Sequence, residues 1–222
     1  MPTYFAGFDS STFPGNELMG WFQENTNLTW CGYYLAAAPS HEDTSWMGQR
    51  ANLQSDGWGL APIYVGQQVT GPGSHEVTTS QGSEDGQHTV QLMNSEGFPA
   101  NSWVYLDLEN GPPYPTAQSG YVQAWASAVQ AGGYLAGIYC SHDLAAAVQQ
   151  QLPASRIWAF RVNTTEQEPF PGTDFPTVAP DECGYPEATM WQLQQNCVVT
   201  AGDDACSLTV DLSSSTVKDP SC

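Results

Sequence analysis

Short apolar runs rich in Val, Ile, Tyr and Trp recur along the chain, with polar or amphipathic stretches between them. Runs of this length and composition are typical of strands. The pattern predicts eight strands, at residues 3–9, 29–36, 58–65, 102–109, 135–141, 156–162, 188–194 and 208–212. Each is short enough to span one layer of a sheet.

Amphipathic spacing between several of these runs predicts helices at residues 17–24, 45–55, 90–96, 116–131 and 143–151. Residues 71–86 are rich in Gly, Ser, Thr and Gln, and we interpret them as a polar loop or as the polar lead-in to the helix at 90–96. Strand followed by helix, repeated about eight times, is the signature of a barrel of parallel strands. The sequence therefore predicts an α/β fold, a single (β/α)8 TIM-like barrel over residues 1–222.

The last third of the chain departs from this pattern. Five prolines break any helical periodicity there, at Pro169, Pro171, Pro176, Pro180 and Pro186. We therefore expect the last two units of the barrel to be degenerate and loop-rich.

The excess of acidic over basic residues limits the kinds of partner that the protein can bind. The chain has 4 Lys and Arg against 23 Asp and Glu, a formal net charge of −19. Such a surface repels nucleic-acid phosphates and anionic lipid headgroups, so neither nucleic acid nor membrane is an expected partner. No run approaches a transmembrane helix and no apolar signal-peptide core follows Met1. We expect a mature secreted, extracellular protein that acts as a monomer.

Six cysteines, an even number, fit an oxidising compartment and a disulfide-stabilised fold. Four fall in the last 40 residues, and we expect two disulfides among Cys183, Cys197, Cys206 and Cys222. Cys31 and Cys140 belong to predicted strands that are not neighbours in a barrel, so we expect buried thiols there. Sequons at Asn27 and Asn163 suggest a glycoprotein.

Two carboxyl groups end the predicted strand at residues 102–109. Asp107 and Glu109 are two residues apart, so on a strand they point to the same face with their Cα atoms roughly 6.6 Å apart. Carboxyl groups that close cannot ionise independently, and one keeps a proton while the other stays charged. Glycosidic bond cleavage requires that division of roles. The alternative is that the two acids only solubilise a strand end or cap the next helix.

In a barrel of this type the reactive side chains come from the C-terminal ends of the strands. Those ends supply several acids, amides and aromatic rings. The candidate residues besides Asp107 and Glu109 are Asp9, Tyr64, Gln67, Gln68, Tyr139, Trp191, Gln192 and Asp211. The four histidines show no metal-ligand spacing, and no Gly-x-Ser-x-Gly nucleophile motif is present. We expect no metal and no cofactor.

Seven segments carry a resemblance to a known family. They are Gly7-Phe-Asp-Ser-Ser11, Gly32-Tyr-Tyr-Leu35, Gly57-Trp-Gly-Leu-Ala-Pro-Ile-Tyr-Val-Gly-Gln-Gln68, Tyr105-Leu-Asp-Leu-Glu109, Gly137-Ile-Tyr139, Met190-Trp-Gln192 and Val210-Asp-Leu212. Across essentially the whole chain the sequence resembles the glycoside-hydrolase-like domain of unknown function found in secreted actinobacterial and fungal proteins. That domain is similar to the glycoside hydrolase family 25 lysozymes and to related fungal muramidases.

The resemblance implies roles for individual residues. Glu109 matches the general acid, and Asp107 matches the acid that positions the substrate acetamide or stabilises a positive intermediate. Asp9 and Asp211 match acids that line the same pocket, and Asp9 counts with the catalytic group. Asp211 and the other candidates, Tyr64, Gln67, Gln68, Tyr139, Trp191 and Gln192, are expected to bind substrate. Gln67 and Gln68 depart from the family 25 pattern, which leaves the substrate open.

The expected function is that of a secreted muramidase (lysozyme), which cleaves the β-1,4 bond between N-acetylmuramic acid and N-acetylglucosamine in peptidoglycan. Three alternatives remain open at this point. The chain is a non-catalytic barrel that binds wall polysaccharide, a hydrolase of another hexosamine polymer, or an inert wall or spore-surface protein.

Overall fold

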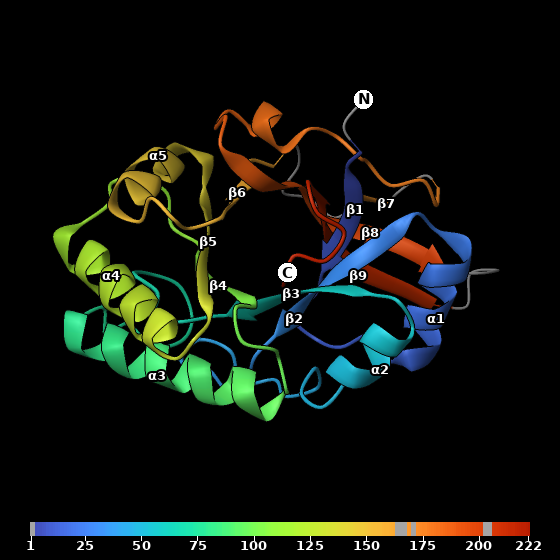
Figure 1. Cartoon of the computed structure of the whole chain (residues 1–222). Helices are drawn as coiled ribbons and strands as arrows, with labels where there is room; N and C mark the ends of the chain where they lie inside the picture. The colour runs from blue at the N-terminus through green and yellow to red at the C-terminus, as the bar shows by residue number, and fades with distance from the viewer. Residues whose placement is uncertain (1–2, 163–167, 170–171, 202–205) are drawn as a thin grey trace.

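The computed structural model describes residues 3–162, 168–169, 172–201 and 206–222, and shows eight strands closed into a barrel with helices around it (Figure 1). The barrel strands are β1 (Phe5–Asp9), β2 (Leu28–Tyr34), β3 (Gly59–Tyr64), β4 (Trp103–Leu108), β5 (Leu135–Ser141), β6 (Ile157–Phe160), β8 (Ala188–Ala201) and β9 (Cys206–Ser215). A further two-residue strand, β7 (Glu168–Pro169), pairs with β8. Each of the eight predicted strands is present.

The direction of the last strand corrects the prediction of an all-parallel barrel. Strands β1 to β6 run in order and β6 pairs in parallel with β8, but β9 is antiparallel to both β8 and β1. The reason lies in the connection, because residues 202–205 alone join β8 to β9. A parallel crossover needs a dozen or more residues, whereas a hairpin needs few. The fold is thus a closed mixed α/β barrel of the TIM-like type.

Five helices surround the barrel in the described part of the chain. They are α1 (Asn16–Asn25), α2 (Arg50–Ser55), α3 (Thr79–Ser95), α4 (Thr116–Ala131) and α5 (His142–Gln151). After α5 the only helical element among the described residues is a 3₁₀ turn, η1 (Pro180–Cys183). This confirms the expected loss of helices in the last units. Helix α2 is shorter than predicted and begins at Arg50.

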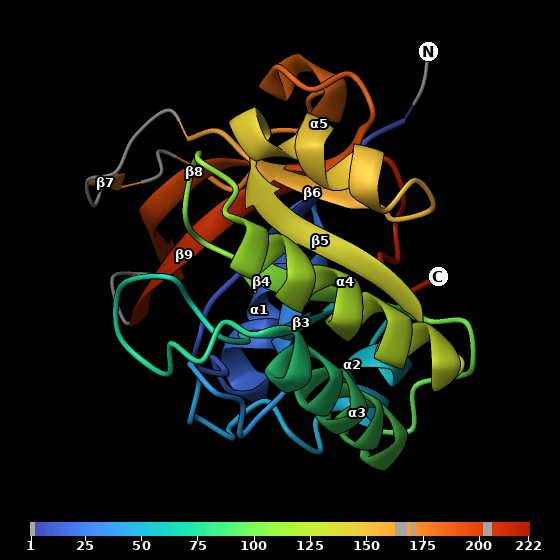
Figure 2. The same cartoon turned by 90° about the vertical axis from the view of Figure 1, so that its left-hand side faces the viewer.

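Helix α3 is longer than predicted because it begins at Thr79, within the polar segment 71–86, whose first half is a loop as predicted. It lies along α4, as Figures 1 and 2 both show. A Cβ atom on Gly86 would lie 2.6 Å from the Trp125 carbonyl oxygen, so this glycine lets the two helices approach closely. Polar groups seal the contact: Tyr121 donates to the Asp85 carboxyl group over 2.6 Å, and the Trp125 indole donates to the Thr89 hydroxyl over 2.9 Å. The buried face of α3 is therefore largely polar, and for this reason the spacing of apolar residues did not predict the first part of the helix.

Aromatic side chains fill the barrel interior. Trp158 lies at their centre, with ring centroids 5.5 Å from Trp30, 5.9 Å from Tyr105 and 5.2 Å from Tyr139. All four are buried, and neighbouring strands make room for them because a Cβ atom on Gly137 would overlap the Tyr105 ring. The interior is thus a packed core.

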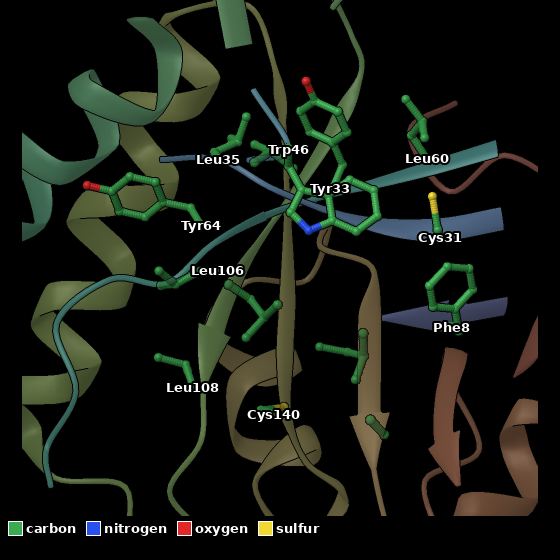
Figure 3. Close-up of a cluster of buried hydrophobic side chains, with 14 of the residues drawn as sticks. Phe8, Cys31, Tyr33, Leu35, Trp46, Leu60, Tyr64, Leu106, Leu108 and Cys140 are labelled. Carbon is green, nitrogen blue, oxygen red and sulfur yellow. The ribbon is translucent and has the colours of Figure 1, made fainter. Parts of the chain in front are cut away.

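The alternate residues of the same strands point outward and pack under the helices. Figure 3 shows this second core, in which Phe8, Cys31, Leu60 and Leu106 come from β1 to β4. Phe8 packs edge-to-face on Phe22 of α1, with 5.3 Å between ring centroids. Strand parity therefore separates an aromatic interior from an aliphatic and aromatic outer layer.

The cysteines agree with the predictions only in part. Cys31 and Cys140 are buried and unbridged in β2 and β5, as predicted. Cys183 and Cys222 are also unbridged, so the disulfides expected of them are not found. The Cys183 Sγ atom instead accepts from the Tyr185 backbone N–H over 3.4 Å. Cys197 is buried in β8, and the side chain of Cys206 lies outside the described residues.

The first sequon has a structural role. Asn27 donates from Nδ2 to the Phe175 carbonyl oxygen over 2.8 Å and accepts from the Phe175 N–H at Oδ1 over 2.7 Å. The Asn27 amide thus links the residue before β2 to Phe175, far along the chain. A glycan attached to Nδ2 would interfere with the hydrogen bond that Nδ2 donates. The structure gives no support to glycosylation at Asn27, and Asn163 lies outside the described residues.

The α3–α4 contact gives a stability prediction. We expect Gly86→Ala to lower the free energy of unfolding by about 1–3 kcal/mol, because the added methyl group overpacks against Trp125 and Ala128. Gly20 in α1 is the matched control, since a Cβ atom there would meet nothing within 4 Å. Gly20→Ala should raise stability by about 0.5–1 kcal/mol through helix propensity. Urea unfolding followed by far-UV circular dichroism measures both, and equal effects would contradict the close-approach role of Gly86.

Candidate active site

Four carboxyl groups meet at the open end of the barrel. Asp9 ends β1, Asp107 is the last but one residue of β4, Glu109 follows β4, and Asp211 lies on β9. All four line one cavity. Asp211 reaches it from an antiparallel strand, where it is the register partner of Asp9.

Asp107 and Glu109 differ in their environments although they face the same cavity. Asp107 is 6% exposed, and its Oδ1 atom is buried without a hydrogen-bond partner. Glu109 is exposed at the mouth. Gln68 braces the backbone of both acids, since its Nε2 donates to the Asp107 carbonyl oxygen over 3.0 Å and its Oε1 accepts from the Glu109 N–H over 3.4 Å. The site thus holds one buried and one accessible carboxyl group on a fixed backbone.

Gln192 joins the other two acids. Its Nε2 donates to Asp9 Oδ1 over 3.3 Å and to Asp211 Oδ2 over 3.2 Å. Its Oε1 accepts from the Tyr139 hydroxyl over 2.7 Å, which fixes the orientation of the amide. Asp211 also accepts from the Asn196 backbone N–H over 2.8 Å. One buried amide therefore links two carboxyl groups that would otherwise repel each other.

The sequence analysis missed Tyr34, which donates its hydroxyl to Asp9 Oδ2 over 3.0 Å. Tyr34 ends β2 and shares the inward face with Gly32, whose missing Cβ leaves room for Asp9. Strand parity within the Gly-Tyr-Tyr segment was the signal that was available. His41 lies behind Tyr34, with 5.0 Å between ring centroids.

The remaining cavity walls are uncharged. They are formed by Ile63, Trp158 and Gln195, which the sequence analysis did not single out, together with Tyr139 and Gln192. Trp158 connects the cavity floor to the aromatic interior. These walls include the hydroxyl group of Tyr139 and the amides of Gln192 and Gln195, so hydrogen-bond donors lie beside the acids.

This environment raises the pKa of three carboxyl groups. Burial is the largest cause for Asp107, followed by the charge of Glu109. Burial and the charge of Asp211 raise the pKa of Asp9, although hydrogen bonds from Gln192 and Tyr34 oppose the shift. Burial raises the pKa of Asp211 to about 6, against the hydrogen bond from the Asn196 N–H. The cluster therefore retains protons in mildly acidic solution.

Two predicted substrate ligands, Tyr64 and Trp191, do not line the cavity. Tyr64 is fully buried and its hydroxyl pairs with His88 Nδ1 of α3 over 3.2 Å, because Ile63 rather than Tyr64 faces the interior. Trp191 donates its indole N–H to the Arg161 carbonyl oxygen over 2.8 Å. Neither lines the cavity, and we leave both out of the proposed site.

Gln67 and Gln68 have bracing roles in the loop after β3. Gln67 accepts from the Glu76 N–H at Oε1 over 2.9 Å, and its own N–H donates to the Tyr121 hydroxyl over 3.0 Å. Both glutamines are buried and neither lines the cavity. Gln68 holds the backbone of Asp107 and Glu109, whereas Gln67 holds the loop after β3.

The described residues contain no group of three or more His, Cys, Asp or Glu side chains arranged to hold a metal ion. Among the same residues, no helix has the length and apolar character needed to cross a bilayer. The chemistry available at the cavity is that of carboxyl, hydroxyl and amide groups.

Comparison with known proteins places the chain in a family. The family model described as "Rv2525c-like, glycoside hydrolase-like domain" matches residues 22–213. The chain belongs to the Rv2525c-like glycoside hydrolase-like family. This confirms the resemblance inferred from the strand-end motifs. A search of curated proteins found no match to this family member.

Solved structures share the fold of this Rv2525c-like chain. An uncharacterized protein from B. stearothermophilus is 18% identical, with a TM-score of 0.64 and 94% of each chain covered. The Mycobacterium tuberculosis Tat-secreted protein Rv2525c, in complex with L-tartrate, is 14% identical, with a TM-score of 0.62 and coverage of 96% of this chain and 95% of that one. A family 25 glycosyl hydrolase from Bacillus anthracis is 13% identical, with a TM-score of 0.61 and coverage of 95% and 88%.

The raised pKa values predict a pH-dependent stability. Asp9, Asp107 and Asp211 bind protons more tightly in the folded chain than in the unfolded chain, so the free energy of unfolding falls as pH rises from about 4 through the folded pKa values. Asp107→Asn removes a buried group that must ionise without a partner. We expect it to raise stability at pH 7 by roughly 1–2 kcal/mol and to flatten the pH slope.

Thermal unfolding from pH 4 to pH 8 measures this effect. Glu42→Gln, which removes an exposed carboxyl group outside the cavity, is the control and should leave the slope unchanged. Equal slopes in the native chain and in Asp107→Asn would contradict the assignment of Asp107 as a destabilising buried acid.

Proposed function

We propose that this chain is a muramidase that acts outside the cell on the β-1,4 bond between N-acetylmuramic acid and N-acetylglucosamine of peptidoglycan. The observation that carries the proposal is the pairing of accessible Glu109 with buried, unpartnered Asp107 in one cavity. The family description and the similar fold of the Bacillus anthracis family 25 enzyme support a hydrolase of this class.

Glu109 is proposed as the general acid. Its carboxyl proton passes to the glycosidic oxygen as the bond from that oxygen to the anomeric carbon breaks. The carbonyl oxygen of the substrate acetamide forms the new bond to the anomeric carbon, so no protein nucleophile is needed. Water then attacks the same carbon and loses a proton to Glu109. The bond between the acetamide oxygen and the anomeric carbon breaks in this step, so the acetamide and the protonated Glu109 are both restored.

Asp107 is proposed to hold the acetamide through its N–H group and to face the positive charge that develops during the reaction. In the free protein, burial and then the charges of Glu109, Asp9 and Asp211 oppose the ionisation of Asp107 and raise its pKa. A cationic intermediate relieves that repulsion, whereas a neutral ground-state sugar does not. The cluster thus stabilises the transition state more than the bound substrate, as catalysis requires.

Replacement of the acid tests the proposal. Glu109→Gln keeps the shape of the side chain and removes its transferable proton, so kcat should fall by about 10²- to 10⁴-fold while binding of the polysaccharide persists. Release of reducing ends from purified peptidoglycan, compared with chitin, is the measurement. Glu42→Gln serves as the matched control and should retain full turnover.

The outcomes separate the alternatives. Unchanged turnover in Glu109→Gln would exclude Glu109 as the acid. Turnover on chitin alone would identify a hydrolase of another hexosamine polymer. Binding to both polymers with no release of reducing ends from either would identify a polysaccharide-binding barrel without catalysis.

The pH profile tests the cluster as a unit. Burial raises the pKa of Asp9 and Asp107, and raises that of Asp211 to about 6, so kcat/KM should peak below neutrality and fall on the alkaline side as these groups lose their protons. Asp211→Asn removes one negative neighbour and so lowers the pKa of Asp9 and Asp107. Its alkaline limb should therefore move to lower pH, measured on a soluble peptidoglycan fragment at fixed ionic strength. An optimum at or above pH 7, or a limb that moves upward, would refute this account.

A further inference from the structure

The loop that follows β3 links the acid site to the helix layer. Its Gln68 side chain braces the backbone of Asp107 and Glu109, and both Gln67 and Gln68 are buried although they belong to no helix or strand. Buried loop residues need partners for their backbone N–H and C=O groups, because water cannot reach them. The partners of this loop therefore decide where the Gln68 side chain lies.

Loop residues supply the partners of the Gln68 backbone. Its N–H donates to the Ser74 carbonyl oxygen over 3.0 Å, and its carbonyl oxygen accepts from His75 Nδ1 over 2.8 Å. The Ser74 N–H in turn donates to the Pro39 carbonyl oxygen over 3.2 Å. None of these partners belongs to a helix or strand, so they do not by themselves tie the loop to the rest of the fold.

Tyr121 of α4 supplies that tie. Its hydroxyl group accepts from the Gln67 N–H over 3.0 Å and donates to one carboxyl oxygen of Asp85, in α3, over 2.6 Å. Gln81 donates from Nε2 to the other Asp85 oxygen over 2.8 Å. Burial, and then the charge of Asp85, raises the pKa of Tyr121, so the hydroxyl group keeps the proton that it donates. One buried hydroxyl group thus joins two helices to the residue beside Gln68.

The close approach of Tyr121 to the loop depends on a glycine. A Cβ atom on Gly66 would lie 2.3 Å from the Tyr121 hydroxyl oxygen, so a side chain at this position would displace the hydroxyl group from the Gln67 N–H. The second polar contact of the same helix pair, from the Trp125 indole to the Thr89 hydroxyl, forms no hydrogen bond to the described loop residues 65–78. The two contacts therefore both join α3 to α4, but one of them also holds the loop.

We propose that Tyr121 is a positioning residue for catalysis, which holds the loop at Gln67 and so keeps Gln68 against the two proposed catalytic acids. The inference rests on the proposed function and assigns a role in it to a residue that does not line the cavity. Without the hydroxyl group, the Gln67 N–H and one Asp85 oxygen would be buried without their partners, which costs free energy unless the loop moves. A displacement of about 1 Å at reacting groups can lower turnover by about 100-fold.

Tyr121→Phe removes the hydroxyl group and keeps the ring. On a soluble peptidoglycan fragment we expect kcat to fall at least about tenfold while KM changes by less than about threefold, because a displaced acid affects the transition state more than ground-state binding. Thr89→Val is the matched control, since it removes a hydroxyl group from the same helix contact without touching the loop. It should lower stability to urea as well, and kcat should stay within about twofold of the native value.

A second readout needs no turnover. The side-chain amide of Gln68 is buried and donates to the Asp107 carbonyl oxygen, which shields its protons from solvent. Nuclear magnetic resonance of the ¹⁵N-labelled protein in D₂O measures the exchange of these protons. Tyr121→Phe should speed their exchange at least about tenfold, whereas Thr89→Val should leave it unchanged under conditions where both variants are fully folded.

Asp85→Asn is a milder variant, and it carries the test if Tyr121→Phe does not fold. It keeps the shape of the side chain but offers one oxygen to two donors, the Tyr121 hydroxyl and the Gln81 amide. The contact between Tyr121 and α3 is thereby weakened while its hydroxyl group remains. We expect kcat and the exchange of the Gln68 amide protons to change in the same directions as in Tyr121→Phe, by smaller factors.

The two proposals fail in different ways. A native kcat in Tyr121→Phe, an equal loss of kcat in Thr89→Val, or unchanged exchange of the Gln68 amide protons would each overturn the positioning role and leave the hydrolase intact. No turnover by the native chain, together with faster Gln68 exchange in Tyr121→Phe alone, would refute the hydrolase and leave intact the role of Tyr121 in holding the backbone of the site.

Discussion

The packing of Trp158 against Trp30, Tyr105 and Tyr139 determines what the open end of the barrel can do. These rings fill the interior, so water and ligands reach only the space above them. The carboxyl groups therefore stand on an apolar floor, and that floor is the reason why burial is the largest cause of their raised pKa values. The core and the chemistry of the site are consequences of the same aromatic packing.

Four carboxyl groups in one cavity are a cost to the folded state. Gln192 and Tyr34 reduce it for Asp9 by donating hydrogen bonds, and Asn196 does so for Asp211. Nothing does so for Asp107 Oδ1. The protein tolerates this cost in the one place where a ligand with positive charge or N–H donors would remove it, which is the usual trade between stability and function at a site.

The sequence predicted the strands well because each is a short apolar run, and it predicted the common face of Asp107 and Glu109 because strand parity is strict. It failed where burial is polar. Helix α3 buries Asp85 and Thr89 against hydroxyl and indole donors of α4, so its inner face carries no apolar stripe. Tyr64 was predicted to face the cavity, but its neighbour Ile63 does so, and Tyr64 points outward to His88. The sequence alone does not show which of two adjacent apolar residues at a strand end faces inward.

The direction of β9 also escaped the sequence, and it matters for the site. Because β9 is antiparallel to β1, Asp211 and Asp9 become register partners across the seam that closes the barrel between its first and last strands. Gln192 of β8 bonds both acids, and Ser213 of β9 accepts from the Trp158 indole over 3.2 Å at the floor. The acid pair therefore exists only when the ends of the chain have come together. Closure of the barrel brings the acids of the cavity together, so a substitution that weakens the seam should disturb ligand binding before it disturbs the distant α3–α4 contact.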